Sequence, residues 1–185
     1  MARTSVVLVL AALTALPVSP SFAAAEKKAK KPAPAPAAAS GGTVRVDGKT
    51  VTLAHGYLFQ APDAFKASQR NSVVLLVPQP VDKAKLEAAK TLREVLDLTK
   101  ERVVVELPPD GSGSISICHE SFGPGMCYST GLAAFTWTPG VKEDGHASGR
   151  VQSFGGKEET VLETRKLLFD VTFDVKGQKS VAARR

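Results

Sequence analysis

Two pairs of residues on either side of a short turn carry the side chains best suited to chemistry. Cys118 and His119 precede the turn at residues 123–125, and Met126 and Cys127 follow it. Thiolate, imidazole and thioether groups are the ligands that hold copper(I) or zinc. The chain has only these two cysteines, and in an oxidising compartment they would pair. We expect a disulfide, with copper binding by the four residues as the alternative.

Nucleophilic catalysis would have to use one of three histidines, at positions 55, 119 and 146. They lie in different segments, so any Ser-His-Asp triad would have to be assembled by the fold. Ser148 follows His146 between two glycines, but it stands one place too late for the Gly-x-Ser-x-Gly nucleophile elbow. A hydrolase with dispersed site residues remains an alternative, and no catalytic residue is assigned.

Two further motifs have simpler explanations. Asp170 and Asp174 share one face of a predicted strand at about 13 Å, whereas a glycosidase carboxylate pair needs at most about 9.5 Å. We expect a solvated strand face there. Residues 155–157, Gly-Gly-Lys, lack the spacing of a phosphate-binding loop, so we expect an ordinary turn.

The segment around the cysteines reads as a hairpin. Ile115 and Ile117 alternate with serines, which indicates a half-buried strand leading into the turn. If the protein binds a partner, Phe122 and Met126 would be apolar anchors exposed at a turn stiffened by the disulfide. The alternative for Phe122 is that it folds back onto the domain.

The rest of the chain predicts a mainly β fold. Asp47-Gly48 favours a type I′ hairpin, and the apolar run at residues 73–77 favours a strand covered on both faces. Residues 169–175 alternate between apolar and polar side chains. One α-helix is expected at about residues 82–97, with Asp82 as its N-cap. We expect an antiparallel β-sandwich or barrel of roughly eight strands.

The N-terminus has the pattern of a secretory signal peptide at residues 1–25. A basic start precedes an apolar stretch from Val6 to Leu16 and a small-residue end. No later stretch reaches the roughly 20 apolar residues that cross a bilayer. We therefore expect a periplasmic or secreted protein with no transmembrane segment in its mature chain.

Composition divides the remainder into three parts. Residues 26–42 are rich in lysine, alanine and proline and predict a disordered tether. Residues 43–176 predict a single β-rich domain, and residues 177–185 a basic disordered tail. Residues 43–175 hold 15 Lys and Arg against 17 Asp and Glu, so the basic pI comes from the two ends. This distribution argues against a nucleic-acid partner and suits attraction to an anionic envelope surface.

Several short motifs resemble a group of small secreted β-rich proteins of Gram-negative bacteria, for which no activity is established. The resemblance spans most of residues 43–175. Its motifs are residues 46–49 and 55–57, Ala64-Phe65, residues 73–77, His119, Gly149-Arg150 and residues 169–173. It implies a secreted β-rich domain and no functional residue.

These observations favour a non-catalytic periplasmic or secreted binding domain over an enzyme. The expected partner is an envelope protein or the cell-envelope surface. Copper at the cysteine hairpin is the only cofactor under consideration.

Overall fold

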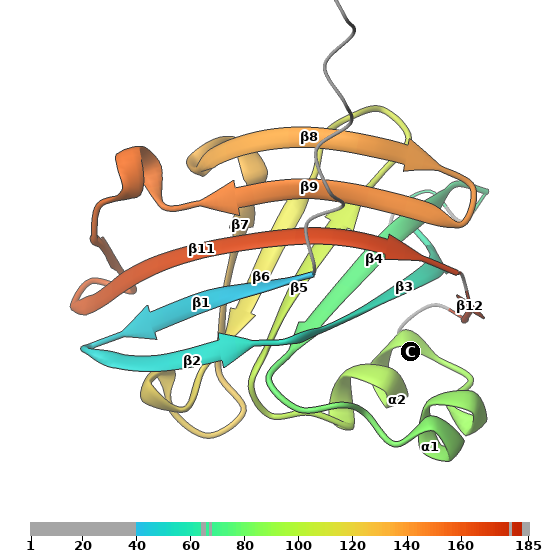
Figure 1. Cartoon of the computed structure of the whole chain (residues 1–185), viewed down its shortest axis with the longest axis horizontal. Coiled ribbons are helices and arrows are strands. Elements are labelled where there is room, and N and C mark those ends of the chain that lie inside the picture. Colours follow the sequence, from blue (N-terminus) through green and yellow to red (C-terminus); the bar gives the residue numbers. More distant parts are fainter. Residues whose placement is uncertain (1–39, 64–65, 67, 178, 183–185) are drawn as a thin grey trace, which may run out of the picture. The chain divides into compact units, whose positions relative to one another are not determined.

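The computed structural model describes residues 40–63, 66, 68–177 and 179–182 as a two-sheet β-sandwich (Figure 1). Twelve strands form two sheets, and neither closes into a barrel. The expected fold class is confirmed, with the sandwich in place of the barrel. The predicted signal peptide and the tether as far as residue 39 lie outside the described residues.

The first sheet pairs the first strand of the domain with its longest strand. Its strand order is β2 (Lys49–Leu53), β1 (Gly41–Val46), β11 (Arg165–Lys176), β9 (His146–Gln152) and β8 (Thr136–Glu143), with β10 (Glu159–Val161) beside β11. All pairs are antiparallel. Asp47 and Gly48 have φ of 51° and 82°, as the predicted type I′ turn between β1 and β2 requires.

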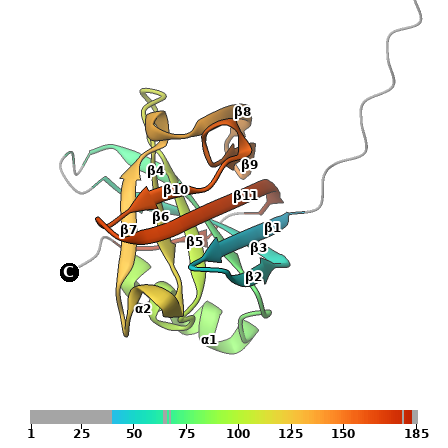
Figure 2. The same ribbon diagram turned by 90° about the vertical axis from the view of Figure 1, so that its left-hand side faces the viewer.

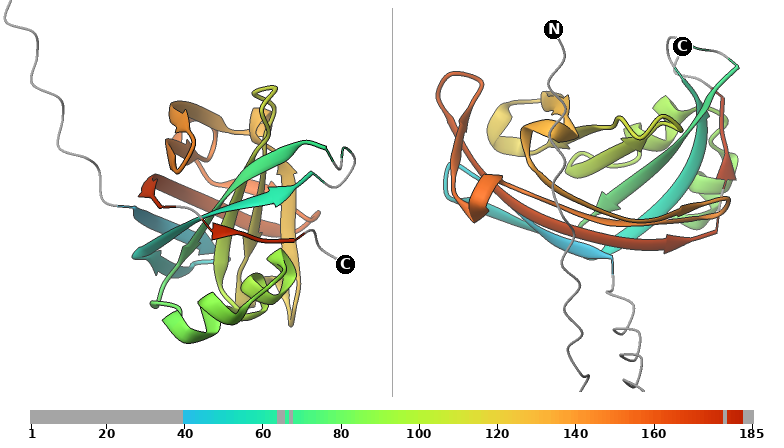
Figure 3. Two further views of the ribbon diagram at one scale, coloured as in Figure 1. Left: turned by 90° about the vertical axis from the view of Figure 1, so that its right-hand side faces the viewer. Right: turned by 90° about the horizontal axis from the view of Figure 1, so that it is seen from above.

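The second sheet is built mainly from consecutive strands. Its order is β12 (Lys179–Ser180), β3 (His55–Pro62), β4 (Arg70–Val77), β5 (Arg102–Leu107), β6 (Ser114–Cys118) and β7 (Cys127–Gly131). Only the pairing of β12 with β3 is parallel. Single 3-10 turns occupy Glu120–Phe122, Leu132–Ala134 and Phe154–Gly156. The right-hand view of Figure 3 shows the two sheets as stacked layers.

The main core fills the space between the sheets. From β11, Phe169, Val171 and Phe173 point inward and are at most 1% exposed, which confirms the alternation expected for residues 169–175. From β4, Val74 and Leu76 enter this core, while Val73, Leu75 and Val77 enter a second core on the opposite face. The prediction that residues 73–77 are covered on both faces is therefore correct.

Two short helices cover the outer face of the second sheet (Figures 1 and 2), where one helix was expected. They are α1 (Lys83–Ala88), whose N-cap is Asp82 as predicted, and α2 (Leu92–Asp97). Thr91 Oγ1 accepts a hydrogen bond from the Glu94 amide, and Glu94 Oε2 accepts one from the Lys90 amide at 2.7 Å. This variant of the capping box starts a new helix at Thr91, so the expected helix is interrupted there.

Both ends of the domain extend beyond the predicted boundaries. Ser40 Oγ accepts a hydrogen bond from the Asp174 amide, and β1 begins at Gly41, so residues 40–42 belong to the fold and not to the tether. The basic tail was also predicted wrongly for residues 179–182. Lys179 and Ser180 form β12, and Val181 is 4% exposed in the core under the helices.

Candidate functional site

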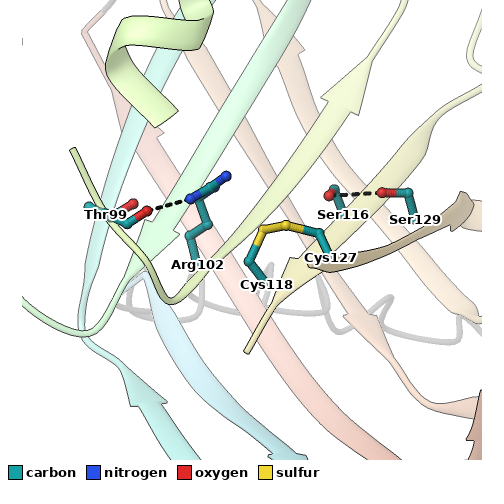
Figure 4. Close-up of a disulfide and its surroundings, with 6 residues drawn as sticks. All are labelled: Thr99, Arg102, Ser116, Cys118, Cys127 and Ser129. Carbon is teal, nitrogen blue, oxygen red and sulfur yellow. Dashed lines mark hydrogen bonds between the residues drawn. A yellow bond between two sulfur atoms is a disulfide. The ribbon is translucent and has the colours of Figure 1, made fainter. Parts of the chain in front are cut away.

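The hairpin of β6 and β7 is closed by the predicted disulfide. Cys118 and Cys127 lie directly opposite each other in the strand pairing, with their Cα atoms 4.2 Å apart. Figure 4 shows the bridge on the same face of the sheet as Ser116 and Ser129, whose hydroxyls hydrogen-bond at 2.9 Å. The bridge ties together the two strands where the turn begins, so it fixes the base of the loop at residues 119–126.

The disulfide uses both sulfurs that the copper alternative needs as thiolates. Among the described residues there is no group of three His, Cys, Asp or Glu side chains placed to hold a metal ion. His119 is 3% exposed, and its Nδ1 accepts a hydrogen bond from the Ser121 amide. Copper binding by Cys118, His119, Met126 and Cys127 would therefore require a reduced and rearranged hairpin.

The structure separates the two residues expected to be exposed anchors. Phe122 is 4% exposed and belongs to the core between the sheets, whereas Met126 is 53% exposed. The 3-10 turn at Glu120–Phe122, capped by His119, bends the chain back toward the domain. Phe122 also meets the His119 ring edge-on, at 6.3 Å between centroids. Exposure of Phe122 is therefore corrected to burial, and Met126 alone remains exposed.

A groove of about 500 Å³ lies between the disulfide loop and the connection from α2 to β5. We call it the hairpin groove; its walls are residues 97 and 99–102 on one side and residues 118–120 and 123–127 on the other. Arg102 ends the first wall, where it pairs with Cys118 across the strands and donates a hydrogen bond to the Thr99 carbonyl (Figure 4). Sequence reasoning missed the wall at residues 97 and 99–102, because only the pairing of β5 with β6 brings this segment beside the hairpin.

Charged contacts fix the neighbouring turns. Glu120 accepts a hydrogen bond from Lys49 Nζ at 3.1 Å, which links the hairpin loop to β2 of the other sheet and lowers the pKa of Glu120. Asp47 accepts hydrogen bonds from the Lys166 amide at 2.9 Å and from Arg165 at 2.8 Å, and both lower the pKa of Asp47. Both carboxylates are ionised at neutral pH; the Asp47 contacts join the β1–β2 turn to β11 within the first sheet, and the exposed Lys49–Glu120 pair is the contact between the sheets.

The outer face of the first sheet carries paired charges where a solvated face was expected. Arg150 donates to Asp170 through Nε at 2.8 Å, and this pair lowers the pKa of Asp170. His146 Nε2 lies 2.7 Å from Asp174 Oδ1. The two aspartates are therefore held by separate partners.

The described residues do not form a catalytic triad around His146. No described serine hydroxyl hydrogen-bonds its ring, and Ser148 Oγ instead accepts a hydrogen bond from the Val141 amide at 2.7 Å. The other two histidines lie at the start of β3 and in the hairpin turn. The hydrolase alternative thus gains no support from an assembled site.

The fold and the site define a β-sandwich domain with a disulfide-closed hairpin beside an open groove. Comparison with known proteins adds no relative: no family model, curated sequence or solved structure matches this chain. Within the described part of the chain, the helices are too short and too polar to cross a membrane. The groove and the surfaces around it are therefore the features of the molecule that bear on function.

Proposed function

We propose that this protein is a non-catalytic binding domain of the periplasm or cell exterior, and that it holds an envelope protein at the hairpin groove. The observation that carries the proposal is the exposed Met126 side chain on a loop fixed by the Cys118–Cys127 disulfide, at the edge of a groove of about 500 Å³. The signal-like residues 1–25 and the disulfide together support the location.

The disulfide lowers the entropic cost of ordering the binding surface. A flexible loop loses conformational entropy when a partner binds, and a crosslink at its base removes part of that loss beforehand. Methionine and arginine are enriched at the centres of protein interfaces, and the hairpin groove has Met126 and Arg102 among its lining residues. A protein surface with an apolar side chain that contacts Met126 would fit this groove.

The test is site-specific crosslinking in living cells. A photo-reactive amino acid replaces Met126 in one variant and Val141, an exposed position on β8 away from the groove, in the control. We expect a discrete adduct with an envelope protein from position 126 and none from position 141. Met126→Glu should reduce co-purification of that protein by about tenfold or more, as for a buried apolar anchor. Equal adducts from both positions, or none from position 126, would exclude the groove.

A further inference from the structure

Strand β7 is the edge of the second sheet, and one side of its backbone is unpaired. The 4.2 Å Cα separation of Cys118 and Cys127 marks a non-hydrogen-bonded pair. Because such pairs alternate with hydrogen-bonded pairs, Tyr128 and Thr130 bond to β6. The amides and carbonyls of Cys127, Ser129 and Gly131 then point away from the sheet. Within the described residues none of these outward groups has a hydrogen-bond partner.

The other sheet edges of the described residues are less available. Strand β10, beside β11, is three residues long and contains Glu159. Edge β8 contains Pro139 and a bulge between Pro139 and Lys142, two features that prevent strand addition. Edge β12 is two residues long. In β2 the tight turn at Asp47-Gly48 sets the pairing, and only Thr50 and Thr52 have backbone amides and carbonyls that point away from β1. Strand β7 has three outward residues and contains no proline, bulge or charge.

We propose that β7 pairs with β7 of a second copy of this chain, antiparallel about a two-fold axis through Ser129. The three outward residues are spaced symmetrically about Ser129, so Cys127 of each copy lies opposite Gly131 of the other. All three sets of outward backbone groups are then satisfied at once. The pairing joins the second sheet of one copy to the second sheet of the other, and the two form one continuous sheet.

The side chains suit this register. Tyr128 of each copy lies opposite Thr130 of the other, and aromatic side chains pair favourably with β-branched ones across strands. Both residues are half-buried in the single chain, so pairing extends a surface that is already partly covered. Strand β7 contains no charged residue, so no like charges lie opposite each other across the axis. The antiparallel arrangement places the two Met126 residues at opposite ends of the paired strands, so this inference does not depend on the partner of the hairpin groove.

The experiment uses charge at the axis. Ser129 is exposed, so Ser129→Lys and Ser129→Glu should fold normally, which circular dichroism and thermal melting check. The protein is expressed with its own N-terminus, purified, and its mass measured by light scattering over a concentration series. We expect a dimer for the unaltered protein, monomers for each variant alone because like charges lie opposite each other, and a mixed dimer when the two variants are combined.

Two further variants keep the test decisive. Thr52→Lys on the β2 edge is the matched control and should leave the dimer intact. Ser129→Cys should form a covalent dimer with a short thiol-specific crosslinker, because the two Cα atoms at the axis would be about 5.5 Å apart. A monomeric unaltered protein, a dimer insensitive to Ser129→Lys, or no mixed dimer would each overturn the proposal.

Discussion

Phe122 and Met126 lie four residues apart in one turn but have opposite roles. Phe122 is buried between the sheets and Met126 projects from the loop. Removing a buried phenylalanine side chain typically costs 3–5 kcal/mol (about 4), whereas exposed substitutions change the free energy of unfolding by less than about 0.5 kcal/mol.

We therefore predict that Phe122→Ala lowers the free energy of unfolding by about 3 kcal/mol or more, and that Met126→Ala leaves it nearly unchanged. Urea unfolding of both variants, followed by circular dichroism, makes the comparison. Equal effects at the two positions would mean that the loop does not fold back as described.

Asp47 supplies a pH-dependent contribution to stability. The Lys166 amide and then the Arg165 side chain lower the pKa of Asp47 in the folded state. A depressed folded pKa means that the ionised carboxylate stabilises the fold above the ordinary carboxyl pKa and that this stabilisation is lost as the pH falls through the folded pKa.

Asp47→Asn keeps a residue that tolerates the positive φ of this position and removes the titrating group. We predict that the unaltered protein is more stable than this variant at neutral pH and that the difference shrinks in strong acid. Urea titrations at a series of pH values measure this difference in the free energy of unfolding. A difference that does not change with pH would contradict a stabilising role for the ionised Asp47 carboxylate.

At the scale of elements, the disulfide stiffens one hairpin without creating the fold. Strand β6 places Ile115 and Ile117 in the main core, and neither side chain is part of the bridge. A bridge with a sequence separation of 9 closes a short loop and contributes about 2–3 kcal/mol.

The double variant Cys118→Ala, Cys127→Ala should therefore unfold at lower urea concentration but keep the β-sheet circular dichroism signal of the unaltered protein. Alkylation under non-reducing conditions is the companion measurement. Two thiols that alkylate freely in the native protein would show that the bridge does not form.

Strand β12 makes a second prediction at this scale. Val181 packs beneath the helices, and Lys179 Nζ donates hydrogen bonds to the carbonyls of Glu87 and Ala89 at the end of α1. Val181→Ala removes two buried methyl groups, at about 0.8 kcal/mol each.

We expect a loss of about 1.5 kcal/mol or more for Val181→Ala and almost none for Val141→Ala, its exposed control at 38%. Thermal melts of the two variants test this. A silent Val181→Ala would mean that the tail does not pack on the helices.

The elements that the sequence predicted are those whose signals are local. The Asp47-Gly48 turn, the run at residues 73–77 and the alternation of residues 169–175 each depend on a few adjacent residues. The break at Thr91 also had a local signal, Thr91-x-x-Glu94, but the apolar stripe of the longer helix outweighed it. Strand β12 had none, because its pairing depends on distant backbone groups: the Val181 amide donates to the Gln60 carbonyl.

The candidate site was predictable only in part for the same reason. The spacing of Cys118 and Cys127 around a turn was enough to predict their bond. Burial of Phe122 depends on the 3-10 turn at Glu120–Phe122, and the alternation of apolar and polar residues in the preceding strand does not predict that turn. The wall at residues 99–102 comes from the connection between α2 and β5 and the first residue of β5, so only the assembled sheet shows that it faces the disulfide.

At the scale of the whole molecule, the ends of the chain should differ in their resistance to proteases. Four lysines lie in residues 26–42 among alanines and prolines, where the sequence offers nothing to pack. Lys179 instead lies in β12, with its ammonium group hydrogen-bonded to carbonyls of α1 and of the residue that follows it.

We predict that the exported protein begins near Ala24 or Glu26 and that trypsin cleaves the tether lysines well before Lys179. Intact-mass measurements during a digestion time course follow both events. Retention of residues 1–16 would indicate an uncleaved anchor, and early loss of residues 180–185 would show that β12 opens readily.

The pairing of β1 with β11 also sets an order of events during synthesis. Strands β3 to β7 can pair once Gly131 has been made, because their partners are their neighbours in the sequence. Strand β1 must wait for β11, whose last residue is Lys176, and contacts between such distant segments form slowly. Until β11 is made, the edge of β1 that pairs with it, including Val44 and Val46, has no neighbouring strand. A nascent chain that stops short of β11 should therefore depend on a chaperone until its last long strand arrives.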